Sequence, residues 1–131
     1  MSVRSSTFLR AALAGDAAVS GATGLLMIVA AGYVDGLLGL PAGLMRYAGL
    51  SLLPFAALVG WLASRESVPR AAVWGVIAYN ALWSIDSLLL LVSGWVAPTA
   101  LGIAFVIAQA LVVAVFAELQ YFGLKRSLAT A

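Results

Sequence analysis

Four stretches of mainly apolar residues, each long enough to cross a lipid bilayer, constrain this chain more than any other feature of its sequence. They run over about 8–33, 41–64, 69–92 and 98–122. A transmembrane helix needs about 20 apolar residues, because roughly 30 Å of hydrocarbon is crossed at about 1.5 Å per residue. None of the stretches alternates apolar and polar residues as the strands of a membrane barrel do. They therefore predict an all-α protein with four transmembrane helices.

The composition agrees with this interpretation and excludes several kinds of site. Hydrophobic residues make up 64% of the chain and charged residues 9%, far fewer charges than a soluble domain carries. The length of 131 residues predicts a single four-helix membrane domain over 1–131. The chain has no cysteine and no histidine, which excludes disulfides, Cys/His zinc sites and histidine-ligated haem. We therefore expect no metal and no cofactor.

Basic residues lie at the ends of the four stretches and predict their orientation. They precede the first stretch, bracket the second connection and follow the last stretch, as Arg4, Arg10, Arg65, Arg70, Lys125 and Arg126. Because cytoplasmic loops are enriched in lysine and arginine, both termini are predicted to be cytoplasmic. The short connections predict antiparallel neighbours in an up-down-up-down bundle. The net charge of +2 then reflects topology and lipid contact, with no nucleic-acid partner.

The first stretch carries one acidic residue, Asp16, and its apolar run continues to Tyr33. That run is longer than the core of a secretory signal, which favours a retained helix. Ser20 and Thr23 follow Asp16 at i+4 and i+7, so a polar stripe points to one side of the helix. Because a charge in hydrocarbon is costly, Asp16 is a candidate for a proton or ligand pathway. The alternative interpretation is an acid that hydrogen-bonds to Ser20 or a neighbouring helix and serves structure alone.

The third stretch holds the richest set of polar side chains. Asn80 begins a stripe with serines four and seven residues later, and Trp83 and Asp86 lie beside it. Such a ridge could line a ligand cavity or form hydrogen bonds between helices, and both interpretations stay open. Arg46, near the start of the second predicted helix, falls at a depth similar to that of Asp86. Since buried charges are normally paired, we predict an ion pair between these two residues. The alternatives are that Arg46 extends to the lipid phosphates or pairs with Asp35.

The fourth stretch places Gln109 near the middle of the bilayer, with Gln120 on the same face of the helix. No enzymatic motif accompanies these residues. Asp16 and Asp86 are predicted at opposite depths, too far apart for joint acid–base catalysis. A serine–histidine pair is excluded and no glycine-rich phosphate loop is present. We therefore expect that the protein is not an enzyme.

One pattern of residues extends over most of the chain. It comprises Leu40-Pro41, Arg46, Gly49, Leu53-Pro54, Trp74, Asn80-Ala81-Leu82-Trp83, Pro98-Thr99-Ala100-Leu101-Gly102 and Gln109-Ala110-Leu111. The pattern resembles a group of small, uncharacterised bacterial four-helix integral membrane proteins. That resemblance implies a multi-pass protein of the bacterial inner membrane, and it implies no activity.

The length, the four helices and the lone acid in the first helix are also similar to the small multidrug resistance transporters. In that family the first-helix carboxylate binds protons and cationic drug in an antiparallel dimer, which implies this role for Asp16 alone. The chain departs from the family, because that position holds glutamate there. The strong positive-inside bias also argues against insertion in two orientations.

Two classes of function follow from these residues. In the first, the chain is a small non-catalytic integral membrane protein that acts as a scaffold or accessory subunit through helix–helix packing. Its partners would be the lipid bilayer and either a second copy or a larger membrane complex. In the second, it is a small transporter or ligand-binding membrane protein that uses the candidates Asp16, Asn80, Trp83, Asp86 and Gln109. We favour the first, because these residues form no continuous polar path across the bilayer.

Overall fold

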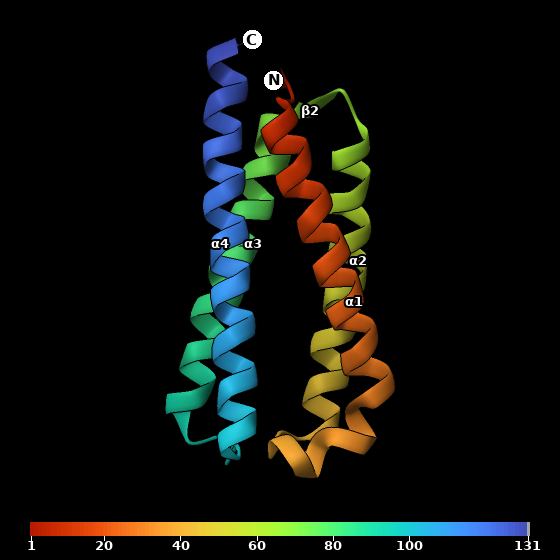
Figure 1. The fold of residues 1–131 in the computed structure, drawn as a ribbon, viewed down its shortest axis with the longest axis vertical. Helices are drawn as coiled ribbons and strands as arrows, with labels where there is room; N and C mark the ends of the chain where they lie inside the picture. The colour runs from red at the N-terminus through yellow and green to blue at the C-terminus, as the bar shows by residue number, and fades with distance from the viewer. Residues whose placement is uncertain (131) are drawn as a thin grey trace.

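The fold is known from a computed structural model, which describes residues 1–130, and its main elements are four long helices (Figure 1). They are α1 (Thr7–Leu38), α2 (Ala42–Ser64), α3 (Arg70–Ser93) and α4 (Ala100–Thr130). Each helix is long and apolar enough to cross a membrane. The prediction of an all-α protein with four helices long and apolar enough to cross a membrane is therefore confirmed.

Two helix ends differ from the prediction, each for a local reason. α1 continues past 33 to Leu38 and stops at Gly39, which adopts a left-handed conformation with φ of 66°. The Gly39 N–H donates to the carbonyl oxygen of Asp35 at 2.8 Å, closing the last turn as a glycine cap does. α4 continues past 122 to Thr130 because no proline or cap interrupts its last, more polar turns.

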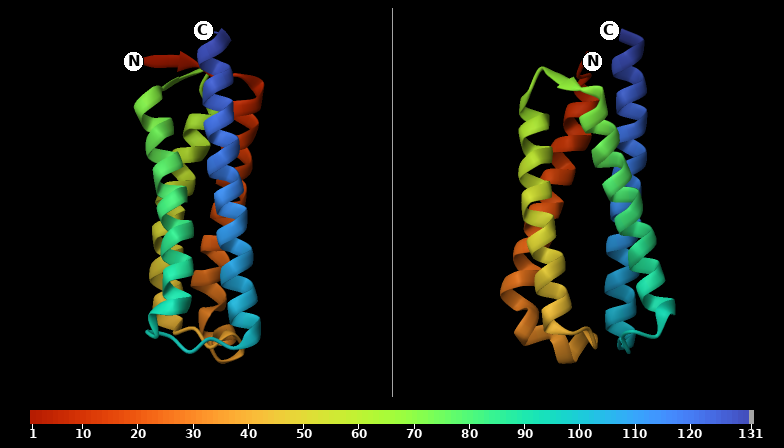
Figure 2. Two further views of the ribbon diagram at one scale, coloured as in Figure 1. Left: turned by 90° about the vertical axis from the view of Figure 1, so that its left-hand side faces the viewer. Right: turned by 180° about the vertical axis from the view of Figure 1, so that it is seen from behind.

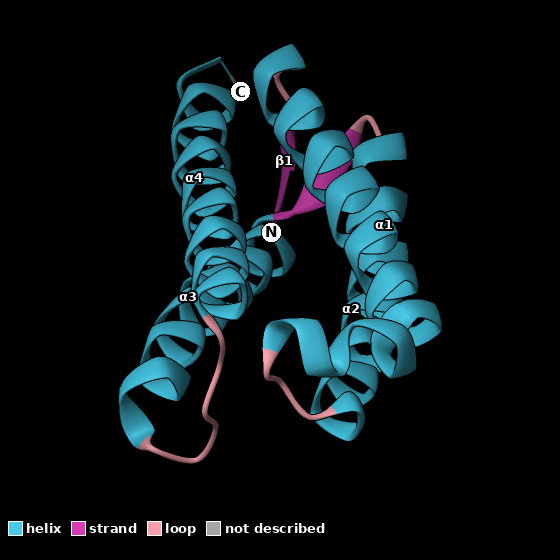
Figure 3. Cartoon of the chain, turned by 60° about the horizontal axis from the view of Figure 1, so that its bottom comes forward, coloured by secondary structure: helices cyan, strands magenta, loops and turns pink. Residues whose placement is uncertain are grey.

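A two-stranded antiparallel sheet, absent from the prediction, joins the N-terminus to the connection between α2 and α3. β1 (Ser2–Arg4) pairs with β2 (Ser67–Pro69), with Val3 opposite Val68 (Figure 3). The pairing continues on both sides, because the N–H of Ser5 donates to Glu66 and that of Arg70 to Met1. Strands of three residues are too short to show a period in the sequence, which is why the sheet was missed.

The helices form two pairs that stand side by side. Both termini and β2 lie at the top of Figure 1, and the α1–α2 and α3–α4 connections lie at the opposite end, as Figure 2 also shows. The closest backbone packing joins α1 to α2, α3 to α4, and α1 to α4. Helices α2 and α3 pack far less closely against each other. Space between the two pairs is therefore left mainly on the α2–α3 side.

The apolar core has two parts. The first surrounds the end that carries the termini and consists of Val3, Leu9, Leu13, Phe55, Val59, Leu62, Val68, Val73, Val76 and Leu124. The second lies toward the other end and consists of Ala31, Leu38, Leu40, Met45 and Val106. Many large apolar side chains remain exposed on the outside, among them Leu26, Val29, Leu82 and Leu111. Such an apolar exterior suits helices that are surrounded by lipid.

Two glycines allow helix backbones to approach closely. At Gly49 of α2, a Cβ atom would lie 2.6 Å from the carbonyl oxygen of Gly24 in α1. At Gly102 of α4, a Cβ atom would overlap the carbonyl group of Leu38 at the end of α1. The same end of α1 is held by Thr99, whose N–H donates to Leu38 at 3.0 Å and whose hydroxyl donates to Leu37 at 2.7 Å. Thr99 thus satisfies two carbonyls that a helix end leaves without partners.

Candidate functional site

A cluster of buried polar side chains joins three of the helices. The carboxylate of Asp16 in α1 accepts hydrogen bonds from the amides of Asn80 in α3, at 2.8 Å, and Gln120 in α4, at 2.6 Å. Its other oxygen accepts from the hydroxyl of Ser20 at 2.8 Å. Asn80 also donates to the amide oxygen of Gln120 at 2.9 Å. We call these four residues the Asp16 cluster.

Three members of the Asp16 cluster, namely Asp16, Asn80 and Gln120, are almost completely buried. Asp16 and Asn80 are each 1% exposed and Gln120 is fully buried. Both carboxylate oxygens are occupied by hydrogen bonds from neutral side chains of the cluster, which is the arrangement expected of a buried polar group. The cluster therefore acts chemically as a hydrogen-bonded link between α1, α3 and α4. Over residues 1–130, no group of three His, Cys, Asp or Glu side chains could hold a metal ion.

Two members of this cluster, Ser20 and Gln120, are not among the five sequence candidates, although Ser20 belongs to the polar stripe that begins at Asp16. Gln109 was chosen on α4, and Gln120 follows it by eleven residues, which is three helical turns and nearly the same face. The periodicity therefore placed Gln120 on an inward face without singling it out. What identifies it is the hydrogen bond to Asp16, which depends on how α4 packs against α1.

The remaining candidates lie further along α3 and α4, toward the end away from the termini. The indole N–H of Trp83 donates to the side-chain oxygen of Gln109 at 2.6 Å. The Gln109 amide donates to the backbone oxygen of Val106 at 2.8 Å, and the hydroxyl of Ser87 donates to that of Trp83 at 2.7 Å. The five candidates thus separate into two groups, Asp16 with Asn80 and Trp83 with Gln109, and Asp86 belongs to neither.

The predicted Arg46–Asp86 ion pair does not form. Over residues 1–130, the carboxylate of Asp86 has no hydrogen bond or ion pair, and its side chain is exposed. Arg46 extends along α1 instead, where its Nη2 atom would lie 3.0 Å from a Cβ atom at Gly32. Similar depth in the bilayer therefore did not bring the two side chains to the same side of the bundle.

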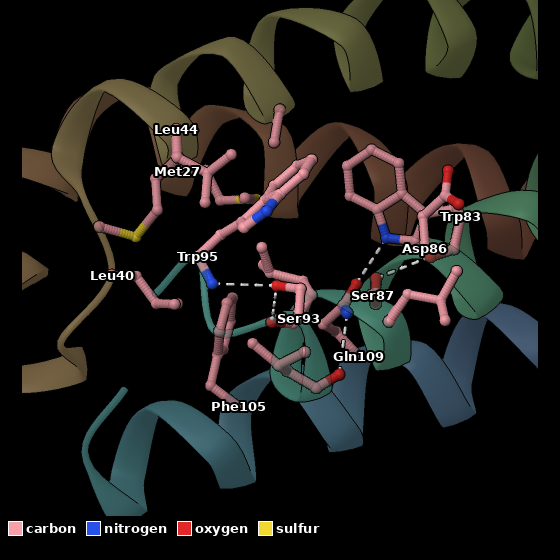
Figure 4. A pocket seen from close by; sticks show the side chains of 15 residues that line it. Met27, Leu40, Leu44, Trp83, Asp86, Ser87, Ser93, Trp95, Phe105 and Gln109 are labelled. Atoms are coloured by element: carbon pink, nitrogen blue, oxygen red, sulfur yellow. Dashed lines mark hydrogen bonds between the residues drawn. The ribbon is translucent and has the colours of Figure 1, made fainter. Parts of the chain in front are cut away.

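A cavity of about 610 Å³ lies between the two helix pairs, in the half of the molecule away from the termini. Figure 4 shows Met27, Leu40 and Leu44 on one side and Trp83, Phe105 and Gln109 on the other. The full lining is Met27, Leu40, Leu44, Met45, Ala48, Trp83, Asp86, Ser87, Leu89, Leu90, Ser93, Trp95, Phe105, Val106 and Gln109. The lining is mainly apolar, and all four helices and two connections contribute to it.

Aromatic side chains connect α2 to α3 and lead to the cavity residue Trp83. The rings of Phe55 in α2 and Tyr79 in α3 stack at 4.0 Å, and the hydroxyls of Tyr79 and Ser51 are 2.8 Å apart. The ring of Tyr79 lies 6.1 Å from that of Trp83, which begins the cavity wall. These contacts bridge α2 and α3 where their backbones are not closely packed.

A second cavity, of about 220 Å³, lies on the α1–α4 side of the same region. It is lined by Ser20, Thr23 and Val112 among others, and it shares Trp83, Phe105 and Gln109 with the large cavity. The hydrogen-bonded pair of Trp83 and Gln109 therefore stands between the two cavities. Neither cavity is lined by Asp16 or Asn80.

Replacing Gln109 with leucine is expected to lower the free energy of unfolding by about 1–2 kcal/mol, because the indole N–H of Trp83 loses its acceptor. The loss is measured by unfolding in mixed detergent micelles. Gln109→Glu keeps an acceptor for Trp83 and serves as the control for the hydrogen bond. Equal unfolding free energies for Gln109→Leu and the unmodified protein would show that this hydrogen bond contributes nothing to the free energy of unfolding.

No protein-family model, no curated protein and no solved structure matches this chain, so its function is argued from the geometry of the cluster and the cavities.

Proposed function

We propose that this chain is a non-catalytic, multi-pass protein of the bacterial inner membrane that binds an apolar molecule in the large cavity. The observation that carries the proposal is the cavity itself. Its volume of about 610 Å³ falls within the range of roughly 300–1,000 Å³ typical of small-molecule sites. Its lining also resembles such sites, because apolar and aromatic side chains dominate and a few polar groups are placed among them.

The route into the cavity is proposed to run from the bilayer between α2 and α3. These two helices pack against each other less than the other neighbours do, and they contribute most of the lining. Lipid hydrocarbon surrounds transmembrane helices at this depth, so an apolar molecule dissolved in the bilayer reaches the opening without crossing water.

The orientation that we propose is an up-down-up-down bundle with both termini in the cytoplasm. Six of the seven basic residues support it, because they lie in segments at the end of the molecule that holds the termini. An excess of lysine and arginine is typical of cytoplasmic membrane ends. The bacterial inner membrane is supported by the resemblance to small bacterial four-helix proteins.

Asp16 and Asn80 have no part in this binding site. Both oxygens of the Asp16 carboxylate and the amide nitrogen of Asn80 are engaged within the Asp16 cluster, and neither side chain lines a cavity. We therefore propose no proton or ligand route through Asp16, and we assign the cluster to holding α1, α3 and α4 together.

A second candidate function is that of a scaffold or accessory subunit, which packs against a second copy or a larger membrane complex. The closed Asp16 cluster favours this candidate, since it fixes three helices without offering a free polar group. The exposed apolar exterior would supply the packing surface. Under this candidate the large cavity binds nothing.

Binding is tested with 11,12-dibromododecan-1-ol, a neutral chain whose bromines quench tryptophan fluorescence. The protein carries Trp61→Phe and Trp74→Phe, so that only the cavity residues Trp83 and Trp95 report, and it is placed in phosphatidylcholine nanodiscs. We expect quenching that saturates with the probe. Probe that is merely dissolved in the bilayer gives quenching that rises without saturation.

The control fills the cavity by Ala48→Phe or, as a second variant, Leu90→Phe. We expect the saturable part of the quenching to be lost in both, while circular dichroism reports unchanged helix content. Unsaturable quenching of the same size with and without these substitutions would refute the binding function and leave the scaffold candidate.

A further inference from the structure

Asp86 is the one ionisable side chain that lines the large cavity in the part of the chain that the structure describes. It projects from α3 beside the indole of Trp83 (Figure 4). The other lining residues are apolar or carry neutral polar groups. A ligand in this cavity therefore meets a single acidic group in an otherwise apolar site.

The chain supplies no positive charge to this acid. Across residues 1–130, Asp86 forms no ion pair. Arg46, the one basic residue in this half of the molecule, extends toward Gly32 on α1, and the other six lie at the end that holds the termini. Because acidic side chains within a membrane normally pair with a partner, a complementary charge is expected from outside the chain.

The polar side-chain groups of Trp83, Ser87, Ser93 and Gln109 in the wall are already engaged within the protein. Trp83 and Gln109 bind each other, and Ser87 donates to the backbone oxygen of Trp83. Ser93 donates to the backbone oxygen of Leu90 at 2.8 Å and accepts from the N–H of Trp95 at 3.1 Å. The carboxylate of Asp86 is thus a strong hydrogen-bond acceptor in the cavity wall that remains available to a ligand.

Aromatic rings beside the acid favour the same kind of group. Trp83 precedes Asp86 by three residues on α3, and both Trp83 and Trp95 line the cavity. The faces of tryptophan rings attract cations that lie within about 6 Å of the ring centre. An ammonium group is therefore attracted by the charge of the carboxylate and by the indole face together, whereas a neutral group gains no charge attraction and an anionic group is repelled.

We propose that the ligand of this cavity is an amphipathic amine, whose apolar body fills the cavity and whose ammonium group lies against Asp86. This inference rests on the proposed binding function and names the chemical class of its ligand. The same chemistry has two sources, a membrane lipid with an amino headgroup or a free amine with a hydrocarbon body.

Three dibrominated probes of equal chain length test the proposal: 11,12-dibromododecylamine, 11,12-dibromododecan-1-ol and 11,12-dibromododecanoate. The Trp61→Phe, Trp74→Phe protein is used in uncharged phosphatidylcholine nanodiscs at pH 7, and quenching of Trp83 and Trp95 is followed. We expect the amine to reach half-saturation at a concentration about tenfold below that of the alcohol, the factor given by one favourable charge contact. The carboxylate probe is expected to bind more weakly than the alcohol.

Asp86→Asn is expected to bring amine and alcohol within about twofold of each other, because the ammonium group loses the opposite charge that favours it over the alcohol. Asp86→Ser is a second variant with the same expectation, and both should fold because the side chain is exposed and makes no hydrogen bond or ion pair that would be lost. Glu118→Gln is the matched control, since it removes an exposed acid on α4 that lies outside both cavities. The amine preference should survive Glu118→Gln.

The outcomes separate the two proposals. Equal saturable binding of amine and alcohol overturns the amine class and leaves the binding function in place. An amine preference that survives Asp86→Asn overturns the contact with Asp86 and also leaves the binding function in place. Saturable binding of neither probe overturns both. Adding phosphatidylethanolamine to the nanodiscs then identifies the source, because weaker amine binding in its presence supports an amino lipid and unchanged binding supports a free amine.

Discussion

Asp16→Leu is expected to lower the free energy of unfolding by about 2–5 kcal/mol. The substitution removes three hydrogen bonds at once and leaves the amide donors of Asn80 and Gln120 buried opposite an apolar side chain. Unfolding in mixed micelles with increasing dodecyl sulfate measures the change. Because Asp16 connects to α3 and α4, we also expect faster proteolysis of the loosened bundle.

Asp16→Asn is the control that separates the hydrogen bonds from the charge. An asparagine oxygen can accept from both Asn80 and Gln120, and its amide group can donate to Ser20, whose hydroxyl rotates freely. We therefore expect a stability within about 1 kcal/mol of the unmodified protein. A loss as large as that of Asp16→Leu would mean that the charge itself is required, contrary to the structural role assigned to the cluster.

The second large effect is expected from Gly102→Ala, which should lower the free energy of unfolding by about 2–4 kcal/mol. The added methyl group overlaps the carbonyl group of Leu38, so α4 must move away from the end of α1. That movement also weakens the two hydrogen bonds from Thr99 to Leu37 and Leu38. The same mixed-micelle titration measures the loss.

Gly75→Ala provides the matched control, because nothing lies within 4 Å of a Cβ atom at that position of α3. Alanine is a better helix former than glycine, so this variant should be more stable by about 0.5–1 kcal/mol. A similar stability change in Gly102→Ala and Gly75→Ala would contradict the close approach of α4 to α1.

The helices could be predicted from the sequence because their signal is local. An apolar run of sufficient length predicts a spanning helix whatever its neighbours are. The polar stripes of α1 and α3 likewise pointed to Asp16 and Asn80 as inward residues. A hydrogen bond from Asp16 to a neighbouring helix was one open interpretation, but its partner Asn80 was not predicted, because a stripe on one helix does not say which helix it faces.

The arrangement of side chains around the bundle could not be predicted in the same way. Depth along a helix says nothing about which neighbour a residue faces, and Arg46 faces Gly32 on α1 instead of Asp86 on α3. The large cavity depends on how far the two helix pairs separate, which is set by contacts such as Phe55 with Tyr79 and Thr99 with Leu37. Such contacts join residues far apart in the sequence and leave no periodic pattern.

The short sheet has a consequence for the order in which the chain is built. During synthesis β1 emerges first and waits without a partner until α1 and α2 have been made and β2 has followed them. Antiparallel pairing of Val3 with Val68 then requires that the start of α1 and the end of α2 have reached the same face of the membrane. If the start of α1 and the end of α2 were inserted on opposite faces of the membrane, β1 and β2 could not pair. The sheet therefore forms only in chains whose first two helices have crossed the membrane in opposite directions.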